Sequence, residues 1–145
     1  MIRRIGEPIR PDVRYTRRPG IYGVLVRDGA VLLTHQMEPQ PEFQIPGGGI
    51  DPGEDPIPAL HREVMEETGW RIGPVRRLGA FRRFTYMPEY DLWAEKVCFV
   101  YAARPSWRVG PPTEEGHTAV WVSPDEAVEL VENDGDRMFL TQHLL

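Results

Sequence analysis

The sequence contains one cysteine, one lysine and no long apolar run. Cys98 alone cannot form an intrachain disulfide or a cysteine-based zinc site, and its apolar neighbours in KVCFVYAA predict a small buried side chain. No segment has the apolar length needed to span a bilayer. The N-terminal residues MIRRIGEPIRPDV lack the apolar block of a secretory signal. We therefore expect a cytoplasmic protein that does not associate with membranes.

An excess of basic charge is also absent. The formal net charge is −5 over 145 residues, which argues against a broad basic surface for duplex nucleic acid. The acidic residues are clustered, however, as a site for a hard divalent cation requires. With no internal repeat or low-complexity linker, residues 1–145 are expected to form a single domain.

The first 18 residues carry six arginines against only two acidic residues. This segment is interpreted as an extended N-terminal arm that contacts a phosphate or a partner. A solvated, partly ordered tail is the alternative.

Hydrophobic periodicity predicts strands that alternate with helices. A hairpin is expected from strands at 20–27 and 30–35, joined by Asp28-Gly29. The other expected elements are strands at 43–46, 72–85, 95–104 and 118–122 and helices at 124–133 and 136–144, with loops at residues 47–55 and 105–117. This order favours an α/β fold with a mixed sheet.

The most clearly bounded element is a helix over residues 56–68. Asp55 can cap its N-terminus, Pro56 falls at the first helical position, and Gly69 is a natural C-terminal stop. A buried apolar stripe is expected at Ile57, Leu60 and Val64.

This helix carries a cluster of carboxylates. Glu63, Glu66 and Glu67 stand at i, i+3 and i+4, so their side chains meet and repel one another. A bound divalent cation would remove that repulsion, and carboxylate oxygens are the ligands that Mg²⁺ and Mn²⁺ prefer. A solvated acidic face is the alternative. Two neighbours favour the metal site: Arg62 can hold a carboxylate in place, and Glu54 ends a glycine-rich loop before the helix.

Residues 48–70, GGIDPGEDPIPALHREVMEETGW, resemble the Nudix box, G-x5-E-x7-R-E-U-x-E-E-x-G-U, in which U is a bulky apolar residue. Every specified position is filled without a gap, Trp70 being a less usual choice at the last one. The matching residues are Gly48, Glu54, Arg62, Glu63, Val64, Glu66, Glu67, Gly69 and Trp70.

The resemblance implies an α/β/α sandwich around a mixed β-sheet, and hydrolysis of a nucleoside diphosphate linked to another group. By position, Glu63, Glu66 and Glu67 would be metal ligands, supported by Glu54, and Arg62 would orient a glutamate. The cofactor would be Mg²⁺, with Mn²⁺ as a substitute. Bound Mg²⁺ would neutralise the diphosphate and activate a water, whose proton a carboxylate would accept.

The sequence does not single out the general base. Glu66 and Glu67 are candidates, as are Glu114 and Glu115 in the loop before the last strand. Glu115 is preferred because it lies six residues before Trp121. An exposed acidic loop is the alternative for this pair, and the four histidines show no metal-ligand spacing.

Substrate contacts are expected at Gly48, whose backbone can approach a phosphate, and at residues 82–93. Phe84 and Tyr86 could stack on a base, and strand alternation allows only one of Arg82 and Arg83 to face a phosphate. Arg83 is the candidate. Tyr86 follows Gly69 by 17 residues, and a tyrosine at about this distance is associated in the family with diadenosine polyphosphate hydrolases.

The small nucleotide-like substrate thus stays open among a dinucleoside polyphosphate, a nucleoside triphosphate and a nucleotide sugar. A non-catalytic, nucleotide-sensing Nudix module is the alternative function, although such modules usually lack box glutamates. An isomerase on the same fold would need a catalytic cysteine, and Cys98 is expected inside a strand. By analogy with the superfamily, the arm could serve a homodimer.

Overall fold

The computed structural model describes residues 1–145, and a mixed eight-stranded β-sheet lies at its centre. Its strands are β1 (Arg3–Arg4), β2 (Thr16–Arg27), β3 (Ala30–Gln36), β4 (Glu42–Gln44), β5 (Gly47–Gly49), β7 (Arg76–Met87), β8 (Leu92–Ala103) and β10 (His117–Val122). The main path runs β1-β7-β8-β2-β3-β10, with β5 beside β2 and β4 beside β3. The β2–β8 and β1–β7 pairs are parallel, whereas β2–β3, β7–β8 and β3–β10 are antiparallel.

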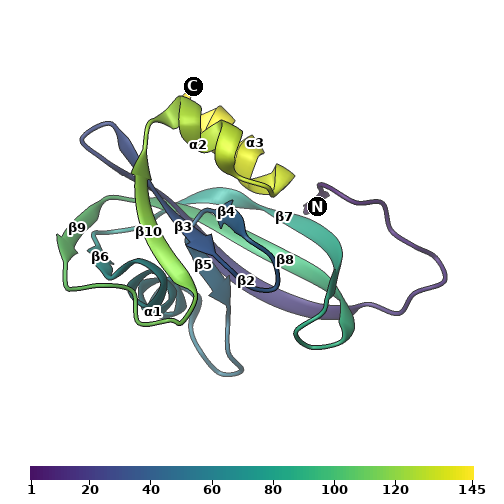
Figure 1. Ribbon diagram of the computed structural model, residues 1–145. Coiled ribbons are helices and arrows are strands. Elements are labelled where there is room, and N and C mark those ends of the chain that lie inside the picture. The colour runs from purple at the N-terminus through teal and green to yellow at the C-terminus, as the bar shows by residue number, and fades with distance from the viewer.

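Helices cover both faces of this sheet. Helix α1 (Pro56–Thr68) lies against one face, and α2 (Pro124–Leu130) and α3 (Asp134–Leu144) lie against the other (Figure 1). A separate two-stranded ribbon of β6 (Trp70–Ile72) and β9 (Pro105–Arg108) stands beside α1. The expected α/β/α sandwich around a mixed sheet is confirmed. No helix has the length and apolar character needed to cross a membrane.

The period-two alternation of the central strands divides the core into two layers. In β2, Ile21 and Leu25 face α1, while Tyr22 and Val24 face α2 and α3. Cys98 is buried in the second layer, as its neighbours predicted. Burial raises the pKa of its thiol to about 12.

Several local predictions differ from the structure. Helix α1 has the expected bounds, but Ile57 is 41% exposed because it falls in the first turn, before the helix packs on the sheet. Ala59 is buried instead. The strand predicted at 72–85 is broken where β6 ends, at Gly73-Pro74, and the predicted loops at 47–55 and 105–117 contain β5 and β9.

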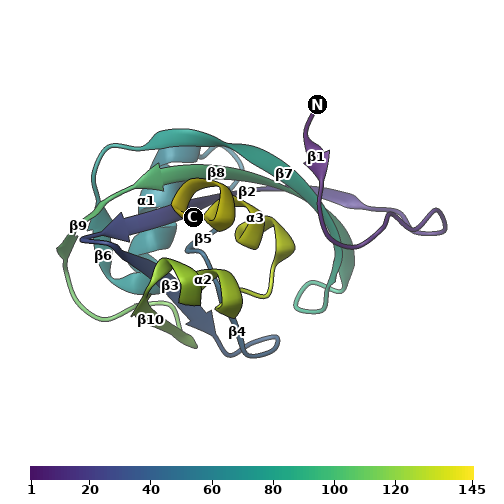
Figure 2. The ribbon, with the colours of Figure 1, turned by 90° about the horizontal axis from the view of Figure 1, so that it is seen from above.

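The N-terminal residues are only partly a free arm. Residues 16–18 already belong to β2, and Arg3–Arg4 form β1 alongside β7. Between them, the chain extends beyond the β7–β8 hairpin (Figure 2). There the Arg10 guanidinium lies 5.0 Å from the centre of the Trp93 ring.

The segment after β9 is anchored to the C-terminal end of α1. The amides of Thr113 and Glu114 both donate to the Glu66 carbonyl, each at 2.9 Å, and the Val109 amide donates to the Gly69 carbonyl at 2.8 Å. Helix ends leave such carbonyls without helical partners, so these bonds satisfy them. The last turn of α1 therefore fixes the position of Glu114.

Gly69 is essential to this anchor. Its φ is +77°, and an added Cβ would lie 1.8 Å from the Gly110 carbonyl oxygen. We predict that Gly69→Ala lowers the free energy of unfolding by about 2–4 kcal/mol, from left-handed backbone strain and overpacking together. Gly110→Ala is the matched control, because a Cβ at Gly110 meets no atom within 4 Å. Equal urea denaturation midpoints for the two variants would contradict this account.

Candidate metal and substrate site

Arg62 connects the glycine-rich loop to the carboxylates of α1. Its Nε and Nη2 atoms donate to the two oxygens of Glu54 at 2.7 and 2.9 Å, and Nη1 donates to Glu63 at 3.1 Å. Nη1 also reaches both Glu66 oxygens at 3.3 Å. The hydrogen bond from Arg62 lowers the pKa of Glu54 to about 2, helped by the Asp51 amide. Glu54 is thereby held against Arg62 as a carboxylate.

The three glutamates of α1 lie in different surroundings. Glu67 is buried, 5% exposed, and accepts a hydrogen bond from the Gly47 amide at 3.0 Å. Burial raises the pKa of Glu67 well above its ordinary value and that of Glu63 to about 7. Glu66 is the most exposed of the three. Two of the carboxylates are therefore poorly solvated and are charged at neutral pH only at a cost, which a nearby cation would offset.

Strand β5 runs directly over these carboxylates. Gly48 pairs with Ile21 of β2, and a Cβ added at Gly48 would lie 2.6 Å from the Glu63 carboxyl carbon. At Gly49, one position further, an added Cβ meets no atom within 4 Å. Glycine at position 48 thus provides the space that the Glu63 carboxylate occupies.

Two residues from beyond the helix complete the cluster. The anchored segment brings Glu114, and the start of β10 brings His117. Within each of two groups, ligand atoms of all members lie within 4.8 Å of one another: Glu63, Glu66 and Glu114 form one, and Glu67, Glu114 and His117 form the other. Glu114 belongs to both. This spacing suits two neighbouring divalent cations.

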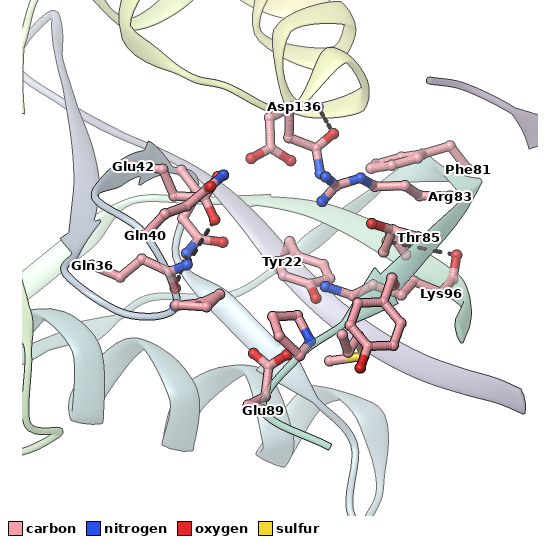
Figure 3. A pocket seen from close by; sticks show the side chains of 17 residues that line it. Tyr22, Gln36, Gln40, Glu42, Phe81, Arg83, Thr85, Glu89, Lys96 and Asp136 are labelled. Carbon is pink, nitrogen blue, oxygen red and sulfur yellow. Dashed lines mark hydrogen bonds between the residues drawn. The ribbon is translucent and has the colours of Figure 1, made fainter. Parts of the chain in front are cut away.

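A cleft of about 260 Å³ borders the cluster and continues into a cavity of about 380 Å³. Six residues line both spaces: Tyr22, Gln36, Gln44, Met87, Glu89 and Lys96. Figure 3 shows the cavity, with Tyr22 between Gln36 on one side and Lys96 on the other. Polar side chains dominate its wall, so it suits a ligand rich in hydrogen-bonding or charged groups.

One buried acid and two cations line this cavity. Asp136 from α3 accepts a hydrogen bond from the Ile45 amide at 3.2 Å, and burial raises its pKa to about 7. Arg83 and Lys96 lie directly opposite each other on β7 and β8, and both line the cavity (Figure 3). Neither forms an ion pair shorter than 4 Å. Like charges so placed repel unless an anion lies nearby.

Residues 15–142 match the family model described as NUDIX domain. The chain belongs to the Nudix family. The "MutT-like protein" of Streptomyces ambofaciens is 29% identical over 75% of this chain. The "CMP-5'-(N-acetyl-N-hydroxy-3-aminopropyl)phosphonate hydrolase" of Streptomyces rubellomurinus is 32% identical over 81% of it. The matches span 66% and 57% of the lengths of these two relatives.

The fold is that of solved Nudix structures. A "NUDIX hydrolase from Nitrosomonas europaea" superimposes with a TM-score of 0.73 over 88% of each chain, at 20% sequence identity. A likeness at this identity establishes the architecture alone.

The structure brings together most of the predicted metal-site residues. Glu63 and Glu66 share one group, Glu67 lies in the other, and Arg62 lies against Glu54, Glu63 and Glu66. Glu54 is paired with Arg62 and belongs to neither group. Glu115 was the preferred general base, but the structure brings Glu114 rather than Glu115 into the two groups. Glu114 reaches both groups because its amide is fixed to the end of α1.

The predicted substrate contacts divide between cavity and core. Gly48 lines the cleft, and Arg83 lines the cavity with Tyr86. Arg82 points the other way, to Glu95 at 3.4 Å, as strand alternation requires. Tyr86 donates a hydrogen bond to Asp91. Phe84 is buried, packs edge-on against Tyr15 with ring centroids 4.9 Å apart and lines neither space, so base stacking by Phe84 is not supported.

Four residues of the site were not anticipated: Tyr22, Lys96, His117 and Asp136. The four histidines show no metal-ligand spacing in the sequence, yet the structure places His117 in the second group. Glu114 lies only three residues before His117, but Glu67 is distant in sequence and only the fold brings it to the pair. The sequence offered one signal for Lys96, because it is the only lysine in the chain. The structure places it opposite Arg83.

We predict that Gly48→Ala displaces the Glu63 carboxylate and weakens metal binding about tenfold or more. The fold should persist, because the contact falls on the far end of a flexible side chain. Titration calorimetry with Mn²⁺ measures the affinity, and Gly49→Ala is the matched control. Equal affinities in the two variants would show that the space at position 48 is not needed.

A second prediction concerns pH and Asp136. Its folded-state pKa of about 7 lies above its ordinary value of 3.8, so its contribution to stability is fully present below about pH 4 and is lost as pH rises through 7. Asp136→Asn should therefore gain stability relative to the parent between pH 4.5 and about 8, by at most about 4 kcal/mol. Urea unfolding at several pH values measures this. A stability difference that does not vary with pH would refute the assignment.

Proposed function

We propose that this chain is a Mg²⁺-dependent hydrolase that cleaves a phosphoanhydride bond in a nucleoside diphosphate derivative, with Mn²⁺ as a substitute. The observation that carries the proposal is the convergence of two ligand groups on Glu114, at the mouth of a polar cavity. Membership of the Nudix family agrees with this reaction class. The relative from Streptomyces rubellomurinus is named as a hydrolase of a CMP-linked phosphonate.

The residues present fit divalent cations. Glu63, Glu66, Glu67 and Glu114 supply oxygen ligands at suitable spacing, and Arg62 is the only cation that contacts them within 3.5 Å. Burial of Glu63 and Glu67 would leave their charges poorly compensated without a metal. When bound, Mg²⁺ would neutralise the diphosphate and lower the pKa of a coordinated water.

The chain's own residues would orient the reacting groups. Arg62 holds Glu54 and Glu63, and the Gly47 amide holds Glu67, so the carboxylates need little rearrangement. A carboxylate oxygen must accept the proton of the attacking water. Glu114 is the candidate that the geometry favours, since it borders both groups and is partly exposed to the cleft. Glu66 and Glu67 remain candidates.

The cavity would hold the part of the substrate beyond the diphosphate. Lys96 lines both spaces and would contact a phosphate at their junction, and Arg83 lies deeper. Tyr86 is exposed at the rim, where a base could stack on it. Dinucleoside polyphosphates, nucleoside triphosphates and nucleotide sugars would all place a diphosphate at the cluster and a polar group in the cavity.

A panel of candidate substrates, with the nucleotide products separated by ion-exchange chromatography, tests the reaction. Purified protein is assayed with Mg²⁺ or Mn²⁺, with and without chelator, on nucleoside triphosphates, diadenosine polyphosphates, ADP-ribose and nucleotide sugars. We expect chelator-sensitive cleavage that is strongest for one class. Metal binding without cleavage of any compound would favour a nucleotide-sensing module instead.

Glutamine variants test the individual roles. Glu67→Gln keeps the shape and the acceptor for the Gly47 amide, so the fold should persist while kcat falls by about a hundredfold or more. Glu114→Gln should behave alike, and Glu115→Gln is the matched control from the same segment. Unchanged turnover in Glu67→Gln would overturn the site, and a loss confined to Glu115→Gln would restore Glu115 as the base.

A further inference from the structure

We propose that His117 is a nitrogen ligand for a divalent cation, so that one of two neighbouring cation positions is a mixed imidazole–carboxylate site that favours Mn²⁺, Co²⁺ or Zn²⁺ over Mg²⁺. The other members are Glu67 and Glu114. The inference rests on the proposed metal-binding role of the cluster, and it adds a ligand that lies outside residues 48–70.

The side chain of His117 is 9% exposed and lies between two carboxylates. Its Nδ1 atom is 3.9 Å from Oε2 of Glu67, and its Nε2 atom is 3.9 Å from Oε2 of Glu114. A hydrogen-bonded ion pair would bring nitrogen and oxygen to about 2.7–2.9 Å. Ligand atoms that share a cation at about 2.1 Å instead lie roughly 3–4 Å apart. The Nε2–Glu114 distance of 3.9 Å falls in this range and is too long for a direct ion pair, and a ligand oxygen of Glu67 completes the group within 4.8 Å.

The Nδ1 atom of the His117 ring has a fixed partner. Oγ1 of Thr34 lies 2.9 Å from Nδ1, and Thr34 is fully buried in β3, the strand that pairs with β10. Nε2 makes no hydrogen bond within the protein. Donation from Nδ1–H to the Thr34 hydroxyl would select the tautomer that leaves the Nε2 lone pair free. Metal-ligating histidines are commonly oriented in this way by a partner on the other nitrogen.

The two groups would then differ in the metals that they prefer. Glu63, Glu66 and Glu114 offer oxygen alone, which suits Mg²⁺. The group with His117 offers imidazole as well, which suits Mn²⁺, Co²⁺ and Zn²⁺ better. Because Glu114 belongs to both groups, filling one position would position a ligand of the other.

Pulsed electron paramagnetic resonance of the Mn²⁺-saturated protein, without substrate, tests the nitrogen ligand directly. We expect nitrogen modulation from a coordinated imidazole that changes when histidine is labelled with ¹⁵N. It should disappear in His117→Gln and persist in His61→Gln, which alters an exposed histidine on α1. Absence of histidine nitrogen coupling in the parent protein would overturn the proposal, whether or not His117→Gln folds.

Titration calorimetry gives the metal preference. His117→Gln should weaken Mn²⁺ and Co²⁺ binding at one site about 10- to 100-fold and Mg²⁺ binding far less. Thr34→Val removes the partner of Nδ1 and should cause a smaller loss with the same order of metals. Equal losses for Mg²⁺ and Mn²⁺ would overturn the preference. Nitrogen coupling in a protein that hydrolyses none of the substrates would support the histidine ligand and reject the proposed function. Hydrolysis without nitrogen coupling would support the proposed function and reject the histidine ligand.

Discussion

Mutual repulsion among the carboxylates of Glu63, Glu66, Glu67 and Glu114 is the constraint on which the site depends. Glu67 is buried and the Glu63 side chain is only 12% exposed, so the charges of these two groups of acids are costly unless positive charge compensates them. Arg62 supplies one charge, but its shortest contacts go to Glu54, so ionisation of the other carboxylates is left largely uncompensated. A cluster that is unfavourable by itself is well suited to divalent cations.

The fold maintains this arrangement through backbone contacts. Gly48 lets β5 approach the Glu63 carboxylate, and the Gly47 amide holds Glu67. The carbonyl groups at the end of α1 bind the amides that fix Glu114. Each of these contacts joins the glycine-rich loop or the segment after β9 to the same helix, so the metal ligands are held by rigid elements.

The cavity beyond the cluster combines opposite charges. Arg83 and Lys96 repel each other across two strands, while Asp136 is buried close to both and has a pKa near neutrality. Such a space disfavours a plain apolar ligand and favours one that brings phosphate and hydrogen-bonding groups together. The proposed substrate, a nucleotide derivative, combines these groups, and its phosphates would lie toward the metal cluster.

Local sequence determined the bounds of helix α1, its C-terminal stop at Gly69 and the order of its glutamates, because helical periodicity depends on residues only a few positions apart. The predicted cap by Asp55 was wrong in part, since Asp55 occupies the N-cap position but its side chain makes no capping hydrogen bond. Apolar patterns likewise predicted the central strands, and the apolar run around Cys98 predicted its burial. Tertiary structure alone decided that Glu114 rather than Glu115 reaches the cluster, that His117 joins it and that Phe84 is packed against Tyr15. Those outcomes depend on strand register and on backbone bonds between segments some 50–80 residues apart, which no local pattern encodes.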